Sequence, residues 1–328
     1  MAKHSADLTT KIVNGLLAID PIANLLKQQA RSMMIKRAKT IGVFWQEEAE
    51  ALRWRHEIPV NLDHSGFAVA PMWETTLGEI QNNHFQYPDY YLRPFHAYAE
   101  GNLGWLPAVE VEVAAKAVHA RIWPEAGAQG DAWLRQSYHA VLQAQLDTPP
   151  QRIIDLGCSV GMSTFTLQSL YPTAQVTGVD LSPYFLAVAQ YQTQRSQAQQ
   201  QPAGENSPFI QWLHAPAEAT GLPAQSFDLV SACLVFHELP QSAAQAILQE
   251  AKRLLKPGGH MALMDMNPQS DTFAKMPPYV FTLLKSTEPY LDEYFDLDLP
   301  QALQSAGFDR PFVTANSPRH RTLIARSL

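Results

Sequence analysis

One stretch, residues 152–180, limits most strongly what this chain of 328 residues can fold into. It starts with a short apolar run at 153–156, which is typical of a buried parallel strand. The mostly small residues of 157–161 break this run, and a helical pattern then continues until Pro172. A second strand pattern follows and ends in the acid Asp180. Strand, small-residue turn, helix, strand and acid in this order predict the first half of a nucleotide-binding βαβ unit.

The residue types in this stretch suit a bound nucleoside. Without side chains at Gly157 and Gly161, the backbone can approach a ligand while its N–H groups point outward. The acid Asp180 can accept hydrogen bonds from both hydroxyls of a ribose. The turn reads Asp-x-Gly-x-Ser-x-Gly, with Asp155 before the first glycine and Ser159 between the two. This order separates it from the dinucleotide-binding fingerprint.

The same order resembles motif I of the class I S-adenosylmethionine-dependent methyltransferases, and Asp180 resembles their ribose-binding acid. Three later segments resemble further motifs of this family and occur in the right order: Ala217-Glu218 followed by Leu222-Pro223, Ser226-Phe227-Asp228, and the Leu-Leu-Lys-Pro-Gly-Gly run at 254–259. The resemblance covers roughly residues 150–328. It implies S-adenosylmethionine as cofactor, S-adenosylhomocysteine as product, and an α/β fold with a doubly wound, seven-stranded, mostly parallel sheet.

Two positions depart from the family pattern. Ser159 stands where the family usually has glycine, which could reshape the pocket around the methionine part of the cofactor. Pro216 stands where the family usually has the aspartate that meets the adenine amino group. Glu218 or a backbone carbonyl would have to make that contact instead.

Ligands of open α/β sheets bind outside the carboxyl ends of the strands. Together with the resemblance, this rule gives the expected cofactor-binding residues: Asp155, Gly157, Cys158, Ser159, Gly161, Asp180, Leu181, Ala217, Glu218 and Leu234. In the same crevice, His237 follows the fourth expected strand and is the best candidate for a catalytic base. The alternative for His237 is a histidine that only packs there. Asp265 and Asn267, near the end of the fifth expected strand, are further candidates.

The amino-acid composition limits the class of protein and the kinds of partner that we expect. Hydrophobic residues make up 46% of the chain and charged residues 17%, which is typical of a soluble globular protein. The net charge of −7 argues against a nucleic-acid partner. Cys158 and Cys233 have no CxxC or Cys/His spacing, so we expect neither a disulfide framework nor a metal site. No signal-peptide core and no apolar run of the ~18 residues that a membrane span requires are present. We therefore expect a cytoplasmic protein.

The first part of the chain differs from the rest. Residues 1–46 carry a net charge of +5 and the remainder −12. This basic stretch is either a solvated helix face or a surface that contacts an anionic membrane. The methionine pair at 33–34 suits a core or an interface, and an interface would fit a homodimer. We expect two domains, an N-terminal helical lid region at 1–148 and a cofactor-binding domain at 149–328.

Element patterns complete the prediction. Helices are expected at 8–42, 45–55, 108–122, 131–146 and 240–255, with one or two more in 276–306. Strands are expected at 209–213, 226–230 and 260–265, followed by an antiparallel pair at 312–314 and 322–325. Loops are expected at 57–75 and, exposed and mobile, at 194–207.

The segment 84–105 is unusually aromatic, with seven Phe, Tyr and Trp residues among polar ones. It suits either the wall of a small-molecule pocket or a packed interface between the two halves of the chain. In the first case, Tyr90, Tyr91, His96 and Tyr98 are the candidate substrate-binding residues. The sequence as a whole predicts a methyltransferase acting on an apolar or aromatic small molecule. The alternative is a regulatory protein that binds the cofactor without turnover.

Overall fold

A computed structural model gives the structure of residues 20–55, 69–96, 98–199 and 210–328. In this part of the chain, seven strands form one sheet in the order β3-β2-β1-β4-β5-β7-β6. The strands are β1 (Arg152–Leu156), β2 (Gln175–Asp180), β3 (Gln211–His214), β4 (Phe227–Cys233), β5 (Leu255–Met266), β6 (Phe312–Ala315) and β7 (His320–Arg326). The first five pair in parallel, and β7 is antiparallel to both of its neighbours. The expected seven-stranded, mostly parallel sheet with a terminal antiparallel pair is confirmed.

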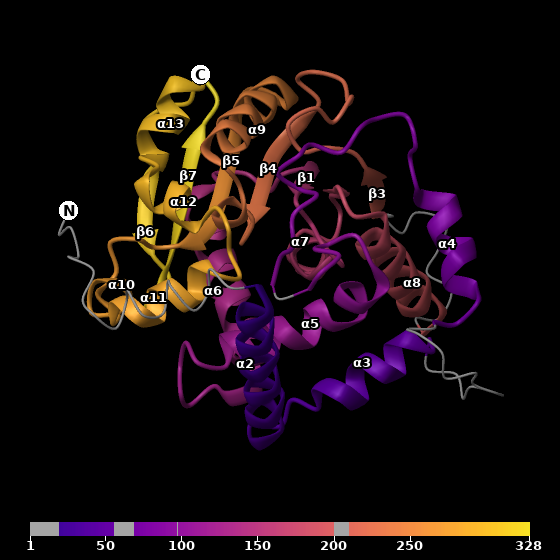
Figure 1. Ribbon diagram of the computed structural model, residues 1–328. Coiled ribbons are helices and arrows are strands. Elements are labelled where there is room, and N and C mark those ends of the chain that lie inside the picture. Colours follow the sequence, from indigo (N-terminus) through magenta and orange to yellow (C-terminus); the bar gives the residue numbers. More distant parts are fainter. Residues whose placement is uncertain (1–19, 56–68, 97, 200–209) are drawn as a thin grey trace.

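Helices cover both faces of this sheet (Figure 1). On one face, α6 (Gly130–Gln145) and α7 (Met162–Leu170) pack on a core that includes Ile153. On the other, α9 (Gln241–Leu254) and α13 (Leu299–Ser305) pack on a core that includes Ile154. Neighbouring residues of β1 thus serve opposite cores, because successive side chains of a strand point to opposite faces. Burial on both faces is the reason why the strands read as continuous apolar runs.

The helices before the sheet pack on one another and on α8. They are α2 (Asp20–Thr40), α3 (Trp45–Arg53), α4 (Met72–Ile80) and α5 (Trp105–His119), and α8 spans Pro183–Gln199. Trp73 of α4 is fully buried in a cluster with Phe185 and Val188 of α8, and its indole N–H donates to the Arg53 carbonyl at 2.9 Å. The N-terminal region therefore docks beside β2 and β3. The domain boundary near residue 148 stays a prediction, and α6, which precedes it, packs directly on the sheet.

Several expected boundaries are wrong. The loop expected at 57–75 gives way to α4 at Met72, and its residues 57–68 lie outside the described part. The loop expected from Gln194 is still α8 up to Gln199, because glutamine and alanine are good helix formers and no proline occurs before Pro202. Likewise, β5 already begins at Leu255, which pairs with Phe227.

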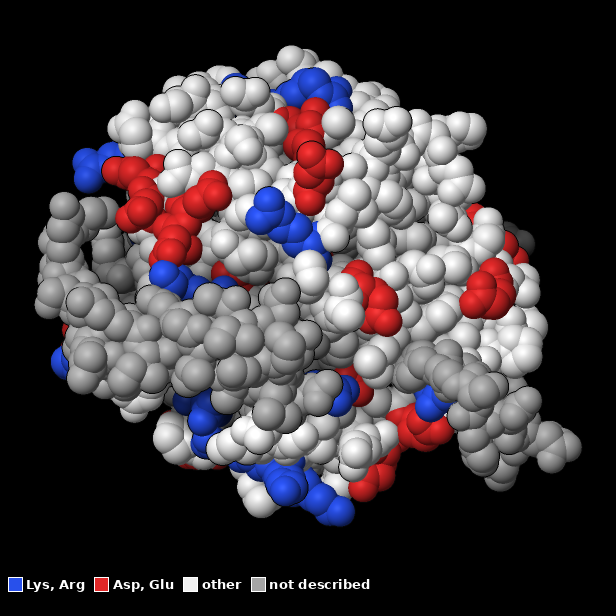
Figure 2. Space-filling view, viewed as in Figure 1, with Lys and Arg blue, Asp and Glu red and all other residues white. Residues whose placement is uncertain are grey.

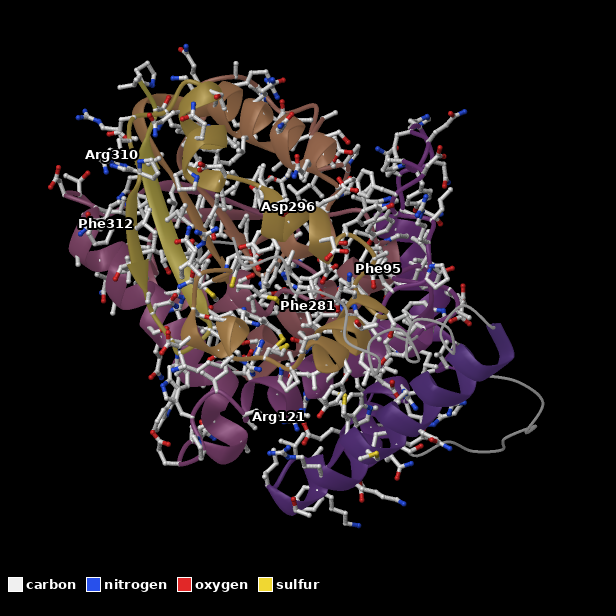
Figure 3. The ribbon with its side chains drawn as sticks, turned by 60° about the vertical axis from the view of Figure 1, so that its left-hand side comes forward. Phe95, Arg121, Phe281, Asp296, Arg310 and Phe312 are labelled. Atoms are coloured by element: carbon white, nitrogen blue, oxygen red, sulfur yellow. The ribbon has the colours of Figure 1, made fainter. Side chains whose placement is uncertain are left out.

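The region 276–306 holds three helices rather than one or two: α11 (Pro278–Lys285), α12 (Leu291–Asp296) and α13. The four-residue α10 (Asp271–Ala274) precedes them. At the far end of the sheet, Phe312 of the edge strand β6 points outward (Figure 3) and is 45% exposed.

Basic side chains gather at the bottom of the face shown in Figure 2, where Figure 1 places α2. The last turn of this helix carries Arg37 and Lys39. Within the described residues, none of the helices is both long and apolar enough to cross a membrane. The expected helix before residue 20 lies outside the described residues, and membrane contact, homodimer formation and a cytoplasmic location stay predictions.

Candidate active site

The glycine-rich turn after β1 is held tightly against β2. The main-chain N–H groups of Gly157 and Cys158 donate to the Val179 carbonyl at 2.8 and 3.0 Å. Gly157 has φ 70°, and a Cβ added there would lie 2.5 Å from Cγ2 of Val235. Glycine is therefore required for conformation and for space. This contact also brings the loop after β4 directly against the turn.

Asp180, at the end of β2, is 8% exposed and faces the same turn. Its Oδ2 accepts from the Ser159 N–H at 2.7 Å, and its Oδ1 accepts from the Ser182 N–H at 2.8 Å and from the Tyr91 hydroxyl at 3.3 Å. Burial raises the pKa of Asp180 to about 6, and the hydrogen bonds partly oppose this rise. The acid is thus ionised at neutral pH and fixed by the turn that it faces.

Three buried polar atoms around this turn have no hydrogen-bond partner among the described residues: Asp155 Oδ1, Ser159 Oγ and Glu218 Oε2. Buried polar groups of this kind are rare unless water or a ligand meets them. The amino-acid end, the ribose and the adenine of S-adenosylmethionine carry donors for such atoms. The glycine cradle, the fixed acid and the unpartnered oxygens therefore fit this cofactor, and the role of Asp180 as acceptor for the ribose hydroxyls stays a prediction.

Asp155 lies beneath the turn and is fully buried. Its Oδ2 accepts from the hydroxyls of Ser163 and Thr164 at 2.6 and 2.7 Å, and burial raises its pKa. This carboxyl group ties the turn to the start of α7, which follows it. Its Oδ1 makes no hydrogen bond of ordinary geometry in the described chain, although the nearby Ser231 hydroxyl also lowers the pKa of this carboxyl group.

The other expected cofactor residues surround the turn. Cys158 is 2% exposed and Leu181 7%, whereas Ala217 packs on the core and Leu234 is half-buried. Gly161, with φ 88°, precedes α7. The structure thus brings all the expected cofactor residues to the carboxyl ends of β1 to β4.

The aromatic segment lies over this cofactor side. Tyr90 donates its hydroxyl proton to Oε1 of Glu218 at 2.8 Å, and Tyr91 reaches Asp180 as described above. Tyr87 stacks on Tyr91 with ring centroids 6.2 Å apart. Both candidate substrate residues, Tyr90 and Tyr91, therefore contact carboxylates of the expected cofactor site.

The remaining two candidate substrate residues, Tyr98 and His96, do not contact the carboxylates of the expected cofactor site. Tyr98 donates to Oε2 of Glu110 at 2.6 Å, and the same carboxylate pairs with Arg31 of α2. His96 lies at the other end of the crevice, with its Nε2 3.0 Å from Glu288 Oε1 and 3.3 Å from Glu238 Oε1. Burial lowers the pKa of His96, but the two carboxylates outweigh it and raise the pKa to about 10. The segment thus packs as an interface between the N-terminal helices and the ends of the strands, and its role as a wall of a substrate pocket stays a prediction.

His237 forms a dyad with Asp265. Its Nδ1 lies 2.7 Å from Oδ1 of Asp265, whose Oδ2 accepts the main-chain N–H of Phe236 at 2.8 Å. Because an ionised carboxylate only accepts, Nδ1 carries a proton, and in the neutral imidazole Nε2 is then the proton-accepting nitrogen. In the described part of the chain, nothing hydrogen-bonds to Nε2. Burial lowers the pKa of His237, but Asp265 outweighs it and raises the pKa to about 9.

Backbone strain concentrates around the crevice. Of five non-glycine residues with positive φ in the described chain, three lie here: His96 (49°), Ser159 (51°) and Leu234 (61°). Left-handed conformations cost such residues about 1–2 kcal/mol each, and they persist where the surroundings hold them. The clustering is consistent with a site whose geometry is fixed in advance.

Some residues of the crevice were missed or only half recognised in the sequence. His214 accepts the Asn82 N–H at its Nδ1, at 2.8 Å, and contacts the Tyr87 hydroxyl, so it anchors the aromatic segment to β3. Glu288 carried no sequence signal, and Asp265 was expected only as a further catalytic candidate and not as the partner of His237. The parallel strands β4 and β5 end side by side, which brings the residues after them together.

A methyltransferase domain family matches residues 154–263. An uncharacterized methyltransferase of Synechocystis sp. is 30% identical over 161 residues, which make up 49% of this chain and 68% of the relative. A ubiquinone biosynthesis O-methyltransferase of Xanthomonas oryzae is 30% identical over 169 residues, 50% of this chain and 65% of that protein. The chain thus spans about two thirds of the length of these relatives. A solved S-adenosylmethionine-dependent methyltransferase of Aquifex aeolicus gives a TM-score of 0.47 at 18% identity, covering 65% of this chain and 98% of that one.

Fold, site and relatives define the class: the chain belongs to the class I S-adenosylmethionine-dependent methyltransferases. It is therefore an enzyme with S-adenosylmethionine as cofactor. The resemblance seen in the sequence motifs is confirmed.

Proposed function

We propose that this methyltransferase acts on a small molecule with an apolar or aromatic body, and that His237, oriented by Asp265, takes the proton of the acceptor. The observation that carries the proposal is the 2.7 Å contact between these two side chains beside the cofactor turn. When bound, the cofactor supplies an electrophilic methyl group on a positively charged sulfur. The protein has to place the acceptor in line with it and to remove the acceptor proton.

The dyad suits removal of the acceptor proton because its geometry leaves Nε2 of His237 as the nitrogen that can take it. Asp265 is 1% exposed and accepts from Phe236 N, His237 Nδ1 and Met266 N, so its position is fixed. The imidazole is therefore held with Nε2 free. A positive charge bound in the crevice disfavours the imidazolium form and makes the neutral base more available.

The surroundings support an acceptor with an apolar body. The loop after β4 offers the half-buried Leu234 and Val235, and the tyrosines of the aromatic segment reach Glu218 and Asp180 of the expected cofactor site. Phe95, labelled in Figure 3, is 2% exposed and lies 6.3 Å from the ring of Tyr290. Small-molecule sites are mostly lined in this way, with a few polar groups that fix orientation. The similarity to a ubiquinone biosynthesis O-methyltransferase is consistent with this class of acceptor.

The test distinguishes a catalytic role of the His237–Asp265 dyad from a purely structural one. His237→Gln should lower kcat by about 10²–10⁴, the usual contribution of general base catalysis, while the affinity for S-adenosylhomocysteine stays within about twofold. His139→Gln, a half-buried histidine of α6, is the matched control and should keep full activity. An unchanged kcat in His237→Gln would remove His237 from the mechanism.

A further inference from the structure

His96, Glu238 and Glu288 come from three distant parts of the chain and meet at one point. His96 belongs to the aromatic segment, Glu238 to the 3-10 turn η2 (Phe236–Glu238) after β4, and Glu288 to the connection between α11 and α12. One ligand atom from each lies within 4.8 Å of the other two. No motif spacing links them, so the sequence predicted no metal site.

We propose that these three side chains bind one divalent transition-metal ion through one imidazole nitrogen and two carboxylate oxygens. This inference goes beyond the proposed function and does not depend on the acceptor or on the His237 dyad. A metal ion bound by these side chains would fix the aromatic segment to the end of β4.

The spacing of the donor atoms fits an ion between them. Around a metal with ligand distances of about 2.0–2.2 Å, neighbouring ligand atoms lie roughly 3.0–3.4 Å apart. The Nε2 atom of His96 lies 3.0 Å from Glu288 Oε1 and 3.3 Å from Glu238 Oε1. Two of the three distances therefore match neighbouring ligands of a first coordination shell, and the third, between the two carboxylates, is at most 4.8 Å.

The cluster is built into the fold. Glu288 is 6% exposed, and its Oε2 is buried without a hydrogen-bond partner in the described chain. The main-chain N–H of His96 donates to the Thr287 carbonyl at 3.1 Å, and His96 is held at φ 49°. Two separate segments are thus fixed so that their side chains converge. An unpartnered buried carboxylate oxygen at that point leaves an acceptor position open to a ligand.

The charges of the three side chains also favour a bound cation. Among the described residues, Glu238 and Glu288 form ion pairs with His96 alone, and neither pairs with a lysine or arginine. A bound metal ion would displace the proton that the two carboxylates hold on His96, and two ionised carboxylates with the neutral imidazole would then balance a charge of +2. A donor set of one nitrogen and two oxygens suits Mn²⁺, Co²⁺ or Zn²⁺, and three protein ligands leave coordination positions open.

The experiment is a titration of the full chain, stripped with a chelator, with Co²⁺ alone. We expect one equivalent per chain, a visible absorption spectrum typical of nitrogen and oxygen ligands, and a rise in the thermal midpoint. Glu288→Gln and His96→Gln should each weaken Co²⁺ binding by at least about 100-fold, since even residues that only support metal ligands contribute 10–100-fold. The exposed residues His84 and Glu79 provide matched controls, and His84→Gln and Glu79→Gln should bind as the wild type does.

S-adenosylhomocysteine binding, measured on each variant, shows whether the fold is intact. If Glu288→Gln does not fold, Glu238→Gln takes its place. Binding of Co²⁺ that is lost in folded variants supports the site. The proposal is overturned if the wild type takes up no stoichiometric Co²⁺, or if folded variants bind it as tightly as the wild type. The cluster would then be a hydrogen-bonded ion cluster that only closes the crevice.

Discussion

The Tyr91 hydroxyl donates to Oδ1 of Asp180 at 3.3 Å, which joins the aromatic segment to the acid that class I methyltransferases use for the ribose. The same oxygen also accepts the Ser182 N–H. A carboxylate oxygen has two lone pairs, so both acceptor positions of Oδ1 are taken. A ribose hydroxyl that binds Oδ1 must therefore displace Tyr91 or share the oxygen with it.

This competition predicts the effect of Tyr91→Phe. The variant keeps the ring stacked on Tyr87 and removes only the hydroxyl. Because a hydrogen bond of this kind contributes about 0.5–1.5 kcal/mol, affinity for S-adenosylhomocysteine should rise by roughly two- to tenfold. Calorimetry on the pure protein measures this change. Tyr87→Phe, whose hydroxyl contacts His214 instead, should bind within about twofold of the wild type. Weaker binding by Tyr91→Phe would show that the hydroxyl contacts the cofactor.

Asp180 itself carries the strongest prediction about the cofactor. Asp180→Ala should weaken cofactor binding by about 1–3 kcal/mol, the range for losing hydrogen bonds to a charged acceptor. Asp89→Ala, on an exposed residue of the aromatic segment, is the control and should change nothing. Equal affinities in Asp180→Ala and the wild type, by the same calorimetry, would rule out Asp180 as the ribose acceptor.

Replacement of Ser159 tests what the serine contributes at a position where the family usually has glycine. Its buried Oγ has no partner in the described chain, so a ligand contact through this atom is worth about 1 kcal/mol. Ser159→Gly should therefore weaken cofactor binding, but by less than about tenfold. Since φ is 51° here, glycine relieves strain and the thermal midpoint should not fall. Gly157→Ala, which meets Val235, should lose both affinity and stability. A loss above tenfold in Ser159→Gly would assign this hydroxyl a larger role in binding.

The buried side chain of His320 makes the free energy of unfolding depend on pH. Burial lowers its pKa well below the ordinary value, so folding holds the imidazole neutral. In the unfolded chain, histidine titrates near pH 6.5. The stabilisation is thus complete above that pH and is lost as the pH falls below it. Denaturant unfolding at pH 7.5 and 5.5 should show lower stability at pH 5.5, and His320→Gln should reduce this difference. A difference as large in His320→Gln as in His84→Gln, the exposed control, would contradict this.

Local patterns were enough to predict the sheet. The apolar run before Gly157, the acid at Asp180 and the apolar stripe of the helix before Leu255 each depend on residues close in sequence. The turn and its acid could be recognised for the same reason. The start of α4 at Met72 was missed because burial of a single side chain, Trp73, decides the structure of that segment.

Contacts between distant segments could not be read in this way. Nothing in the sequence specifies that Tyr91 meets Asp180 or that Glu288 meets His96, because these pairs depend on how the aromatic segment and the α11–α12 connection cross the crevice. The pairing of His237 with Asp265 is intermediate. His237 follows β4 and Asp265 lies at the end of the neighbouring parallel strand β5, so their proximity follows from strand order once the sheet is known.

The central claim is that the crevice methylates a small molecule with the help of His237. The direct measurement incubates pure enzyme with methyl-labelled S-adenosylmethionine and a small-molecule extract, and then separates low-mass products from protein and nucleic acid. We predict label in an apolar, low-mass product with the wild type, and at least about a 100-fold lower rate with His237→Gln at unchanged cofactor affinity. Label that appears only in macromolecules, or at equal rates with both proteins, would contradict the account.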